Sequence, residues 1–474
     1  MQKNNQNFYF LSVDSSSSSC KVCLINSRTG EIDFLFTESI NTYFPKPGWV
    51  EHDGDEIYEK LLLLLQKAVS IVSRERIIGI GITNQRESVI AWDKNTLKPV
   101  CAVISWQDSR NEDFLHRWRD KEEFIKSKTG LYLNSYFSAS KIDWIIKNID
   151  FSWEDIRFGT VDTWLIANLT GGAEFVTDVT NASRTMCMNL EKEIWDLDLL
   201  EMFGIPLYTL PTIKPSGSYF GSWRKIPILG VIGDQQAALL SLGSKPGIIK
   251  CTYGTGLFVL INSGNKRVYV DNALTTIGWK IEGEKTVYAL ENGSFVCGNI
   301  LTKLKNGGFI DNYLIEDNTI VDCIYIEPID DRLFIFDKKK WKKLSDGIDL
   351  SKDRGEIVFK AYLNGLACST KEMLKCFQVL DFDLNEIYVN GLISTSDYLR
   401  KVQSLILNKQ IIASKDALDS ALGVAYLVGL YSGIITWDQI HDWNSLDAKT
   451  DYPIDDFSAT KTLEMKWEKY KSSL

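Results

Sequence analysis

Apolar residues near the start of the chain fall into short runs that polar turns separate. Runs at 8–13, 21–26 and 31–38 predict consecutive antiparallel strands. A broad apolar face from about residue 55 to 72 predicts a helix, and the continuous apolar run 77–83 predicts a strand buried on both faces. Ser138 is the expected N-cap of a further helix, because apolar positions at helical spacing follow it.

The second half of the chain partly repeats this pattern. Residues 226–234 predict a buried strand, and 248–264 predict two strands around a glycine-rich turn, much like the first hairpin. A strand at 386–391 and a mostly apolar helix at 420–435 follow. Alternating strands and helices predict an α/β fold, and the two similar hairpins predict two related lobes, at 1–245 and 246–474. The stretch 330–356 has no clear period, and its lysines among 338–343 predict a solvated loop.

Composition narrows the class of protein. A length of 474 residues suits two domains, and 45% hydrophobic with 24% charged residues is ordinary globular composition. The net charge of −9 argues against a nucleic-acid partner. The apolar run at the N-terminus is too short for a signal peptide, and no run reaches the roughly 18 residues that span a bilayer. We therefore expect a cytoplasmic protein without membrane insertion.

Cys20 and Cys23 have the CxxC spacing of a redox or zinc site. On a strand, however, residues three positions apart point to opposite faces. The chain has no second CxxC pair and only three histidines. We therefore expect buried, reduced thiols in place of a metal or redox site.

Polar clusters close three of the apolar runs, at 84–87, 106–108 and 233–239. Their mixture of carboxylate, amide, arginine and aromatic side chains suits a small polyhydroxylated ligand. Asp234 follows a predicted buried strand, where it can act as a helix N-cap, as a base that removes a hydroxyl proton, or as both. Arg86 and Glu87 could instead form a surface ion pair, and Trp106 could belong to the core.

Asp14 is followed by a run of serines and then by Lys21. This segment is either a flexible linker or a tight hairpin turn whose N–H groups and hydroxyls cradle a phosphate. The strands predicted on both sides favour the turn. The sequence contains neither GxxxxGK[ST] nor GxGxxG.

Taken together, these residues resemble the FGGY carbohydrate kinases, most closely the glycerol kinases among them. The resemblance covers most of the first 300 residues, and its motifs occur in order: GWVEHD (48–53), GITNQRE (81–87), SWQDSR (105–110), YFSASKIDW (136–144), FGTVDTWLIANLTGG (158–172), VTDVTNASRTM (176–186), GDQQAAL (233–239) and TYGTG (252–256), with ALGVAYLVGL (421–430) near the end. It implies two ribonuclease-H-like lobes of the actin type, with a ligand cleft between them. It also implies transfer of phosphate from ATP to glycerol, with Mg²⁺ as cofactor, and a possible homodimer.

The resemblance assigns roles to individual residues. Asp234 would be the catalytic base, and Asp14 and Asp234 would serve the metal. The glycerol-binding positions would be Arg86, Glu87, Trp106, Tyr136, Asp234, Gln235 and Phe258, and all of them carry the family's residue. The nucleotide-binding positions would be Ser16, Ser17, Ser18, Lys21, Gly254, Thr255, Gly298, Thr302, Gly391 and Ser396.

The nucleotide half departs from the family's pattern. A glycine of the family's first turn is Ser16, and its arginine is Lys21. A glutamine is replaced by Thr302, the second glycine of a Gly-Gly pair by Leu392, and an asparagine by Ser396. Ser16 would carry backbone strain if its φ is positive. These departures keep alternatives open: a kinase with impaired activity, a glycerol-binding pseudokinase that senses or scaffolds, or a kinase for another small polyol or with another phosphate donor.

One departure concerns regulation. Many bacterial glycerol kinases carry a glycine-rich loop before the strand that leads to GDQQ, and this loop binds the inhibitor fructose 1,6-bisphosphate. Here residues 221–227 form only a short connection without those glycines. We expect no inhibition by that sugar bisphosphate.

Overall fold

The computed structural model describes residues 7–254, 256–294, 297–310, 315, 319–326, 344–382, 384–413, 418–445, 449–451 and 457–472. Thr255 and the lysines among 338–343, which are predicted to form a loop, lie outside these ranges. Strand β21 (Leu344–Asp346) follows them and pairs with β20 (Ile324–Ile326).

The first lobe is built on a six-stranded sheet with the order β14-β15-β5-β1-β2-β3. Strands β1 (Tyr9–Ser15), β2 (Ser19–Asn26) and β3 (Ile32–Ser39) pair antiparallel, as predicted. Strand β5 (Ile77–Asn84) runs parallel to β1, and β15 (Ile226–Gly233) runs parallel to β5. Strand β14 (Ser222–Trp223) closes the edge as one arm of a hairpin with β15.

Helices cover this sheet and extend the lobe. Helix α1 (Gly54–Ile71) begins at Asp53, whose carboxylate accepts hydrogen bonds from two backbone N–H groups. Its buried leucines share a core with the inner faces of β1, β2 and β5. The rest of the lobe comprises α2 (Glu112–Trp118), α3 (Glu122–Thr129), α4 (Ser138–Asn148), α5 (Val161–Leu169), α6 (Val179–Ala182), α7 (Leu197–Phe203) and short strands β4 (Glu51–His52), β6 (Ile90–Asp93), β7 (Lys98–Pro99), β8 (Val103–Ile104), β9 (Ile156–Gly159), β10 (Val176–Asp178), β11 (Met188–Asn189), β12 (Ile194–Trp195) and β13 (Thr212–Lys214).

The second lobe repeats the central part of the first. Its seven-stranded sheet has the order β18-β19-β17-β16-β22-β23-β24. Strands β16 (Ile249–Tyr253) and β17 (Leu257–Gly264) form an antiparallel hairpin, and β22 (Glu386–Asn390) runs parallel to β16, just as β5 runs parallel to β1. The remaining elements are β18 (Leu274–Trp279), β19 (Val287–Ser294), β23 (Gln410–Ala413), β24 (Lys449–Asp451), α9 (Gly298–Asn306), α10 (Glu356–Lys375), α11 (Asp397–Leu407), α13 (Trp437–Ser445) and α14 (Phe457–Ser472).

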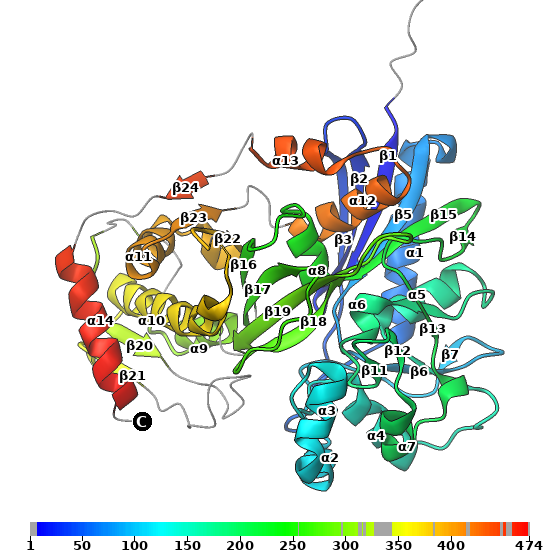
Figure 1. The fold of residues 1–474 in the computed structure, drawn as a ribbon, viewed down its shortest axis with the longest axis horizontal. Coiled ribbons are helices and arrows are strands. Elements are labelled where there is room, and N and C mark those ends of the chain that lie inside the picture. The colour runs from blue at the N-terminus through cyan, green and yellow to red at the C-terminus, as the bar shows by residue number, and fades with distance from the viewer. Residues whose placement is uncertain are drawn as a thin grey trace, which may run out of the picture.

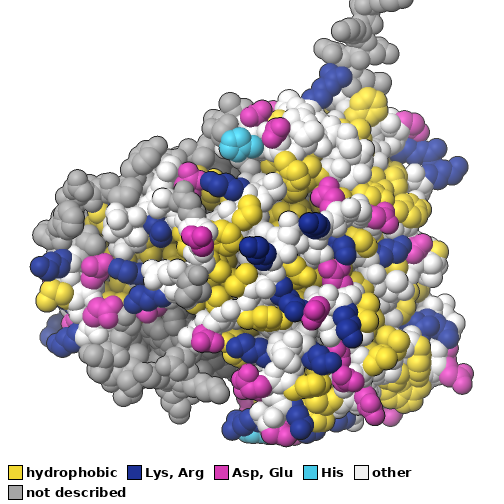
Figure 2. Space-filling view, viewed as in Figure 1, with side chains coloured by type: hydrophobic (Ala, Val, Ile, Leu, Met, Phe, Trp, Pro, Cys, Tyr) yellow, Lys and Arg dark blue, Asp and Glu magenta, His cyan; other side chains and the backbone are white. Residues whose placement is uncertain are grey.

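The predicted α/β fold with two related lobes is therefore confirmed (Figure 1). The first sheet ends at residue 233 and the second begins at residue 249, while the boundary at 245 stays a prediction. Among the described residues, no helix is long and apolar enough to cross a membrane. Basic and acidic side chains are interspersed over the visible face (Figure 2).

The two lobes are joined through helix α12 (Asp419–Tyr431), which lies beside the first sheet although it comes late in the chain (Figure 1). Ser12 of β1 donates a hydrogen bond to the Ala421 carbonyl at 2.8 Å. Helix α12 also crosses α8 (Asp234–Leu240) so closely that a Cβ on Gly423 would lie 1.8 Å from the Ala237 carbonyl oxygen. Only glycine permits this approach, so the crossing fixes the start of α8 relative to the first sheet.

The surroundings of Ser138 and of the two cysteines on β2 can be compared with the sequence predictions. Ser138 is the first residue of α4, and the N-cap is Phe137; the Ser138 hydroxyl instead donates to the Glu87 carbonyl at 3.0 Å. The N-cap prediction was therefore wrong by one position, because the hydroxyl has a distant acceptor that sequence spacing cannot show. Cys20 and Cys23 on β2 are free, buried thiols that pack into different cores, which agrees with opposite faces of a strand.

Candidate active site

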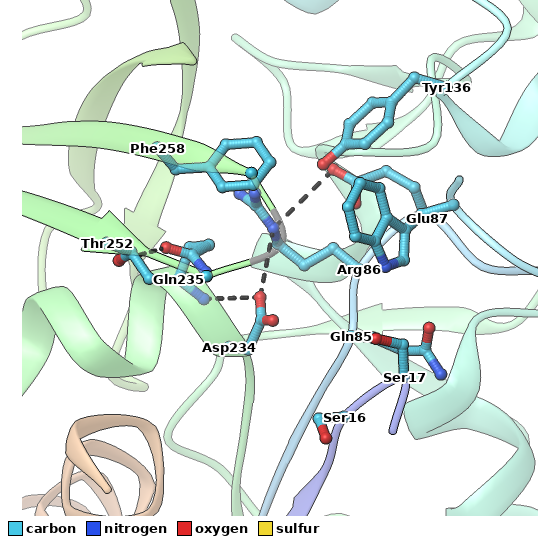
Figure 3. A pocket seen from close by; sticks show the side chains of 13 residues that line it. Ser16, Ser17, Gln85, Arg86, Glu87, Tyr136, Asp234, Gln235, Thr252 and Phe258 are labelled. Atoms are coloured by element: carbon cyan, nitrogen blue, oxygen red, sulfur yellow. Dashed lines mark hydrogen bonds and ion pairs between the residues drawn. The ribbon is translucent and has the colours of Figure 1, made fainter. Parts of the chain in front are cut away.

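One pocket brings together side chains from both lobes. It is lined by Ser16, Ser17, Gln85, Arg86, Glu87, Trp106, Tyr136, Asp234, Gln235, Thr252, Gly254, Gly256 and Phe258 (Figure 3). The clusters predicted at 84–87 and 233–239 meet because β5 and β15 run parallel, so the residues that follow them emerge at the same edge of the sheet. All the candidate polyol residues line this pocket.

Asp234 is the first residue of α8, directly after β15, and its N-cap is Gly233. Its side chain keeps 28% of its surface exposed, and one carboxylate oxygen lies 3.4 Å from the Nε of Arg86. The same oxygen accepts a hydrogen bond from the Gln235 backbone N–H at 2.7 Å. Burial raises the pKa of Asp234 to about 6, against the opposing effect of Arg86 and with help from the charges of Glu87 and Asp14. A carboxylate with this pKa is ionised at neutral pH and still a useful proton acceptor.

Arg86 and Glu87 are not a surface pair, because both are almost completely buried. The Arg86 guanidinium donates to Glu291 at 2.6 Å and 3.2 Å. Arg184 donates from its Nε to Glu87 at 2.6 Å and from an Nη to Glu291 at 2.8 Å. Two arginines and two carboxylates therefore form one buried network, of which Arg86 and Glu87 line the pocket.

Glu87 has a backbone φ of 62°, in the left-handed region that non-glycine residues rarely adopt. Its carboxylate is held by Arg184 and its carbonyl accepts the Ser138 hydroxyl. Such a conformation costs on the order of 1 kcal/mol or more and persists only where surrounding contacts fix it. The strained backbone turns Glu87 into the pocket.

Aromatic rings form the apolar wall. The Trp106 ring meets Tyr136 at a centroid distance of 5.7 Å and Phe258 at 6.2 Å, both edge to face. Trp106 is partly exposed and lines the pocket, so it is not simply a core residue. A carbon chain of three or four atoms can pack against these faces while its hydroxyls point toward the charged residues.

Gln235 is oriented by the second lobe. Its amide oxygen accepts from the Lys250 ammonium at 3.1 Å and from the Thr252 hydroxyl at 3.0 Å. A lysine can only donate, so these contacts fix which end of the amide is the oxygen and turn the NH₂ group away from Lys250. Burial lowers the pKa of Lys250 to about 8, although Asp419 and Asp234 oppose the shift.

The nucleotide candidates are spread more widely than the polyol candidates. Ser16, Ser17 and Gly254 line the pocket, and the turn at 16–19 is closed by a bond from the Ser16 N–H to the Ser19 carbonyl at 2.9 Å. Ser16 is not among the residues with positive φ, so the strain considered for it does not arise. Ser18 is exposed at the tip of this turn. The turn prediction is confirmed over the linker prediction.

Asp14 lies at the end of β1, beneath that turn. Its carboxylate accepts from the Ser420 hydroxyl of α12 at 2.9 Å and lies 3.8 Å from the Lys21 ammonium. Burial raises the pKa of Asp14 despite the attraction of Lys21. Neither Asp14 nor Lys21 lines the pocket.

Two candidates of the second lobe, Gly298 and Gly391, contact the end of β16. The Gly298 N–H at the start of α9 donates to the Gly254 carbonyl at 3.0 Å. Gly391 has a φ of 96°, and a Cβ there would lie 2.2 Å from the Tyr253 carbonyl oxygen, so both conformation and space require glycine. Ser396 caps α11, and exposed Thr302 donates to the Gly298 carbonyl at 3.2 Å. The side chain of Leu392 and the whole of Thr255 lie outside the described parts of the chain.

Comparison with known proteins identifies the family. The N-terminal domain of the FGGY family of carbohydrate kinases matches residues 9–241. A glycerol kinase of Mycoplasmopsis pulmonis is 37% identical to this chain, over 92% of the chain and 91% of that protein. The chain belongs to the FGGY family of carbohydrate kinases.

Other proteins similar to this FGGY kinase point to the same family. A glycerol kinase of Bacillus cereus (strain ATCC 14579) is 36% identical, covering 97% of this chain and 98% of that protein. A crystal structure of Plasmodium falciparum glycerol kinase with ADP shares 30% identity with a TM-score of 0.88, over 98% of each chain. A xylulose kinase from Lactobacillus acidophilus has a TM-score of 0.84 at only 17% identity, over 98% of this chain and 97% of that chain, which shows a common fold alone.

Sequence reasoning missed several residues of this FGGY kinase that organise the site. Glu291 and Lys250 come from the second lobe and reach side chains that the first lobe supplies. Arg184 stands within the 176–186 motif, but its link to Glu87 depends on the fold. Buried charges bordering an apolar strand, as in YALENG and IIKCTY, were the only sign available in the sequence.

Proposed function

We propose that this FGGY kinase transfers a phosphate group from ATP to glycerol and forms glycerol 3-phosphate. The observation that carries the proposal is the pocket in which all the candidate polyol residues meet around Asp234. The glycerol kinases among its relatives, with coverage of nearly the whole chain, support the same substrate. The proposed lobes, 1–245 for the polyol and 246–474 for the nucleotide, follow from the resemblance, as do cytoplasmic location and a possible homodimer.

In the proposed reaction Asp234 accepts the proton of the attacking glycerol hydroxyl. That oxygen forms a bond to the γ-phosphorus, the bond to the β-phosphate oxygen breaks, and ADP leaves. Asp234 suits this role because its pKa of about 6 leaves it ionised near neutral pH while it faces the pocket. Arg86 and Glu87 would bind the remaining hydroxyls, with Gln235 donating through its NH₂ group. Trp106 and Phe258 would hold the carbon chain so that the hydroxyl is aligned.

For the nucleotide we propose the positions that the resemblance implies: Ser16, Ser17, Ser18, Lys21, Gly254, Thr255, Gly298, Thr302, Gly391 and Ser396. Asp14 and Asp234 would serve Mg²⁺, and their chemistry fits, since both offer the hard oxygen donors that this ion prefers. Their proximity fits as well, because the charge of Asp14 contributes to the raised pKa of Asp234. When bound, Mg²⁺ neutralises charge on the transferring phosphates.

A second candidate is a glycerol-binding pseudokinase that senses or scaffolds. The substitutions at 16, 302, 392 and 396 favour it, because all of them concern the nucleotide positions while the polyol positions are intact. A kinase for another small polyol, or with another phosphate donor, is the third.

A coupled assay distinguishes these functions. The purified chain is incubated with Mg²⁺, glycerol and ATP, GTP or CTP, and formation of the nucleoside diphosphate is measured. We expect glycerol-dependent turnover with ATP. Turnover with another nucleotide alone would identify a different donor. Glycerol binding by calorimetry without turnover on any donor would establish the pseudokinase instead.

A further inference from the structure

Glu291 is a charged residue of the second lobe that does not line the pocket yet contacts two arginines of the first lobe. It lies on β19 and is almost fully buried. One of its oxygens accepts from Arg86 at 2.6 Å, and the other accepts from Arg86 at 3.2 Å and from Arg184 at 2.8 Å. Burial alone would raise the pKa of its carboxyl, but Arg184 and Arg86 together lower it, so the group is ionised.

These contacts fix the orientation of the Arg86 guanidinium in the pocket. The donors of a guanidinium lie in one plane, so a carboxylate that binds both Nη atoms fixes the direction of the Nε edge. In this protein Glu291 takes the Nη atoms, and the Nε atom lies 3.4 Å from Asp234 and 3.8 Å from Glu87. Arg184 extends the same control to Glu87, since it binds Glu291 and Glu87 at once.

We propose that Glu291 is a positioning residue through which the second lobe orients Arg86 and Arg184, and with them the polyol wall and the base of the first lobe. The inference rests on the proposed function and adds a determinant of glycerol affinity. It also explains why a carboxylate is kept in an apolar sheet: two buried guanidinium groups require more negative charge than Glu87 alone supplies.

The charge of Glu291 also bears on Asp234. The groups that face Asp234 are Arg86 and Glu87 after β5, Asp14 on β1 and Lys250 on β16. Arg86 is attracted to Asp234, but Glu291 binds it more closely, at 2.6 Å against 3.4 Å. Loss of the Glu291 charge would leave Arg86 more strongly paired with Asp234. The guanidinium would then turn away from the direction in which it lines the polyol wall of the pocket.

The test compares Glu291→Gln with Glu193→Gln in the full chain. Glu193 is the matched control: it also joins the lobes, through Lys280 and Thr286, but it does not line the pocket or touch the arginines. The kcat and the KM for glycerol are measured with MgATP, and glycerol affinity is measured by calorimetry. For Glu291→Gln we expect the KM and the dissociation constant for glycerol to rise about tenfold while the KM for MgATP stays unchanged. Glu193→Gln should keep the wild-type KM and affinity for glycerol.

A second variant separates charge from reach. Glu291→Asp keeps the charge but is too short to hold both arginines, so we expect reduced glycerol affinity although the charge is retained. If Glu291→Gln does not fold, Glu291→Asp alone tests the inference, and unchanged glycerol affinity in Glu291→Asp would overturn it. If Glu291→Gln folds and behaves like Glu193→Gln, the inference is overturned as well. Absence of turnover by the wild type would instead count against the proposed function, while calorimetry on the variants would still test Glu291.

Discussion

The residues proposed to bind the polyol and those proposed to bind the nucleotide differ in how far their side chains are bound to one another. On the polyol side, Arg86, Glu87 and Asp234 belong to one connected set of ion pairs, and the second lobe holds it through Glu291. Among the proposed nucleotide positions, Ser18 and Thr302 are exposed, and Ser396 serves to cap a helix; none of the three lines the pocket. The departures from the family's pattern that the resemblance implies all fall in this second group.

This difference has a physical reason. A change at Arg86 or Glu87 would leave other buried charges without partners, which is costly, so the polyol side tolerates little. A change at an exposed position costs the fold almost nothing and affects only the ligand. The two sides can therefore diverge separately, and measurements that treat glycerol and ATP independently are the way to test that view.

The largest effect is expected from Asp234→Asn. Loss of the general base should lower turnover by roughly 10²–10⁴. Glycerol should still bind, because its other contacts remain. Turnover is measured by the coupled assay and affinity by calorimetry. Asp196→Asn is a matched control, since it changes a helix-capping aspartate outside the pocket and keeps a good capping group. Unchanged turnover in Asp234→Asn would remove this residue from the mechanism.

The second largest effect is expected when the substrate is changed. The polar wall of the pocket can satisfy three hydroxyls, and a substrate without them leaves buried charges unpaired, which costs about 1–3 kcal/mol for each. We expect 1-propanol-type analogues to bind at least about a hundredfold more weakly than glycerol. Five-carbon sugars should clash with Trp106. Calorimetry that shows xylulose or ribulose binding more tightly than glycerol would contradict this, even though xylulose kinases share the fold.

ATP affinity is expected to differ more clearly from the family than glycerol affinity. By the resemblance, leucine stands at 392 where the family has glycine, and Thr302 and Ser396 stand where the family has longer polar residues. Each loss is worth about 1 kcal/mol, so ATP affinity should be on the order of millimolar or weaker. In a thermal-shift titration glycerol should stabilise the protein, and MgATP alone should do so barely.

Variants that restore glycine test whether the added side chains cause the weak ATP binding. We expect Leu392→Gly to strengthen ATP binding about tenfold and Ser16→Gly to do less, because Ser16 carries no positive φ and its hydroxyl bonds within the turn. Glycerol affinity of both variants is the internal control and should not change. Micromolar ATP binding by the unmodified chain would refute the weak-nucleotide view and the pseudokinase with it.

The sequence was sufficient for much of this structure, and the limits are specific. Strands such as β5 and β15 were predictable because continuous apolar runs mark strands buried on both faces. The pocket residues were predictable through the resemblance, since they follow those strands. Glu291 was not, because its partners are distant in sequence and only the packing of the lobes brings them together. The position of α12 against the first sheet is hidden for the same reason.

The smallest expected effect concerns fructose 1,6-bisphosphate, for which we predict no inhibition. The segment before β15 is a two-residue hairpin turn, in which Trp223 pairs with Ile226 and both Arg224 and Lys225 have positive φ, at 48° and 68°. Such a turn is too short to wrap its N–H groups around a phosphate. The kinase rate is measured with the sugar bisphosphate at concentrations that act on other family members. Arg224→Ala is the control for simple charge attraction, and we expect it to behave like the wild type. Inhibition of the wild type that disappears in Arg224→Ala would show that the hairpin binds phosphate through its side chains, and the argument from loop length would then be wrong.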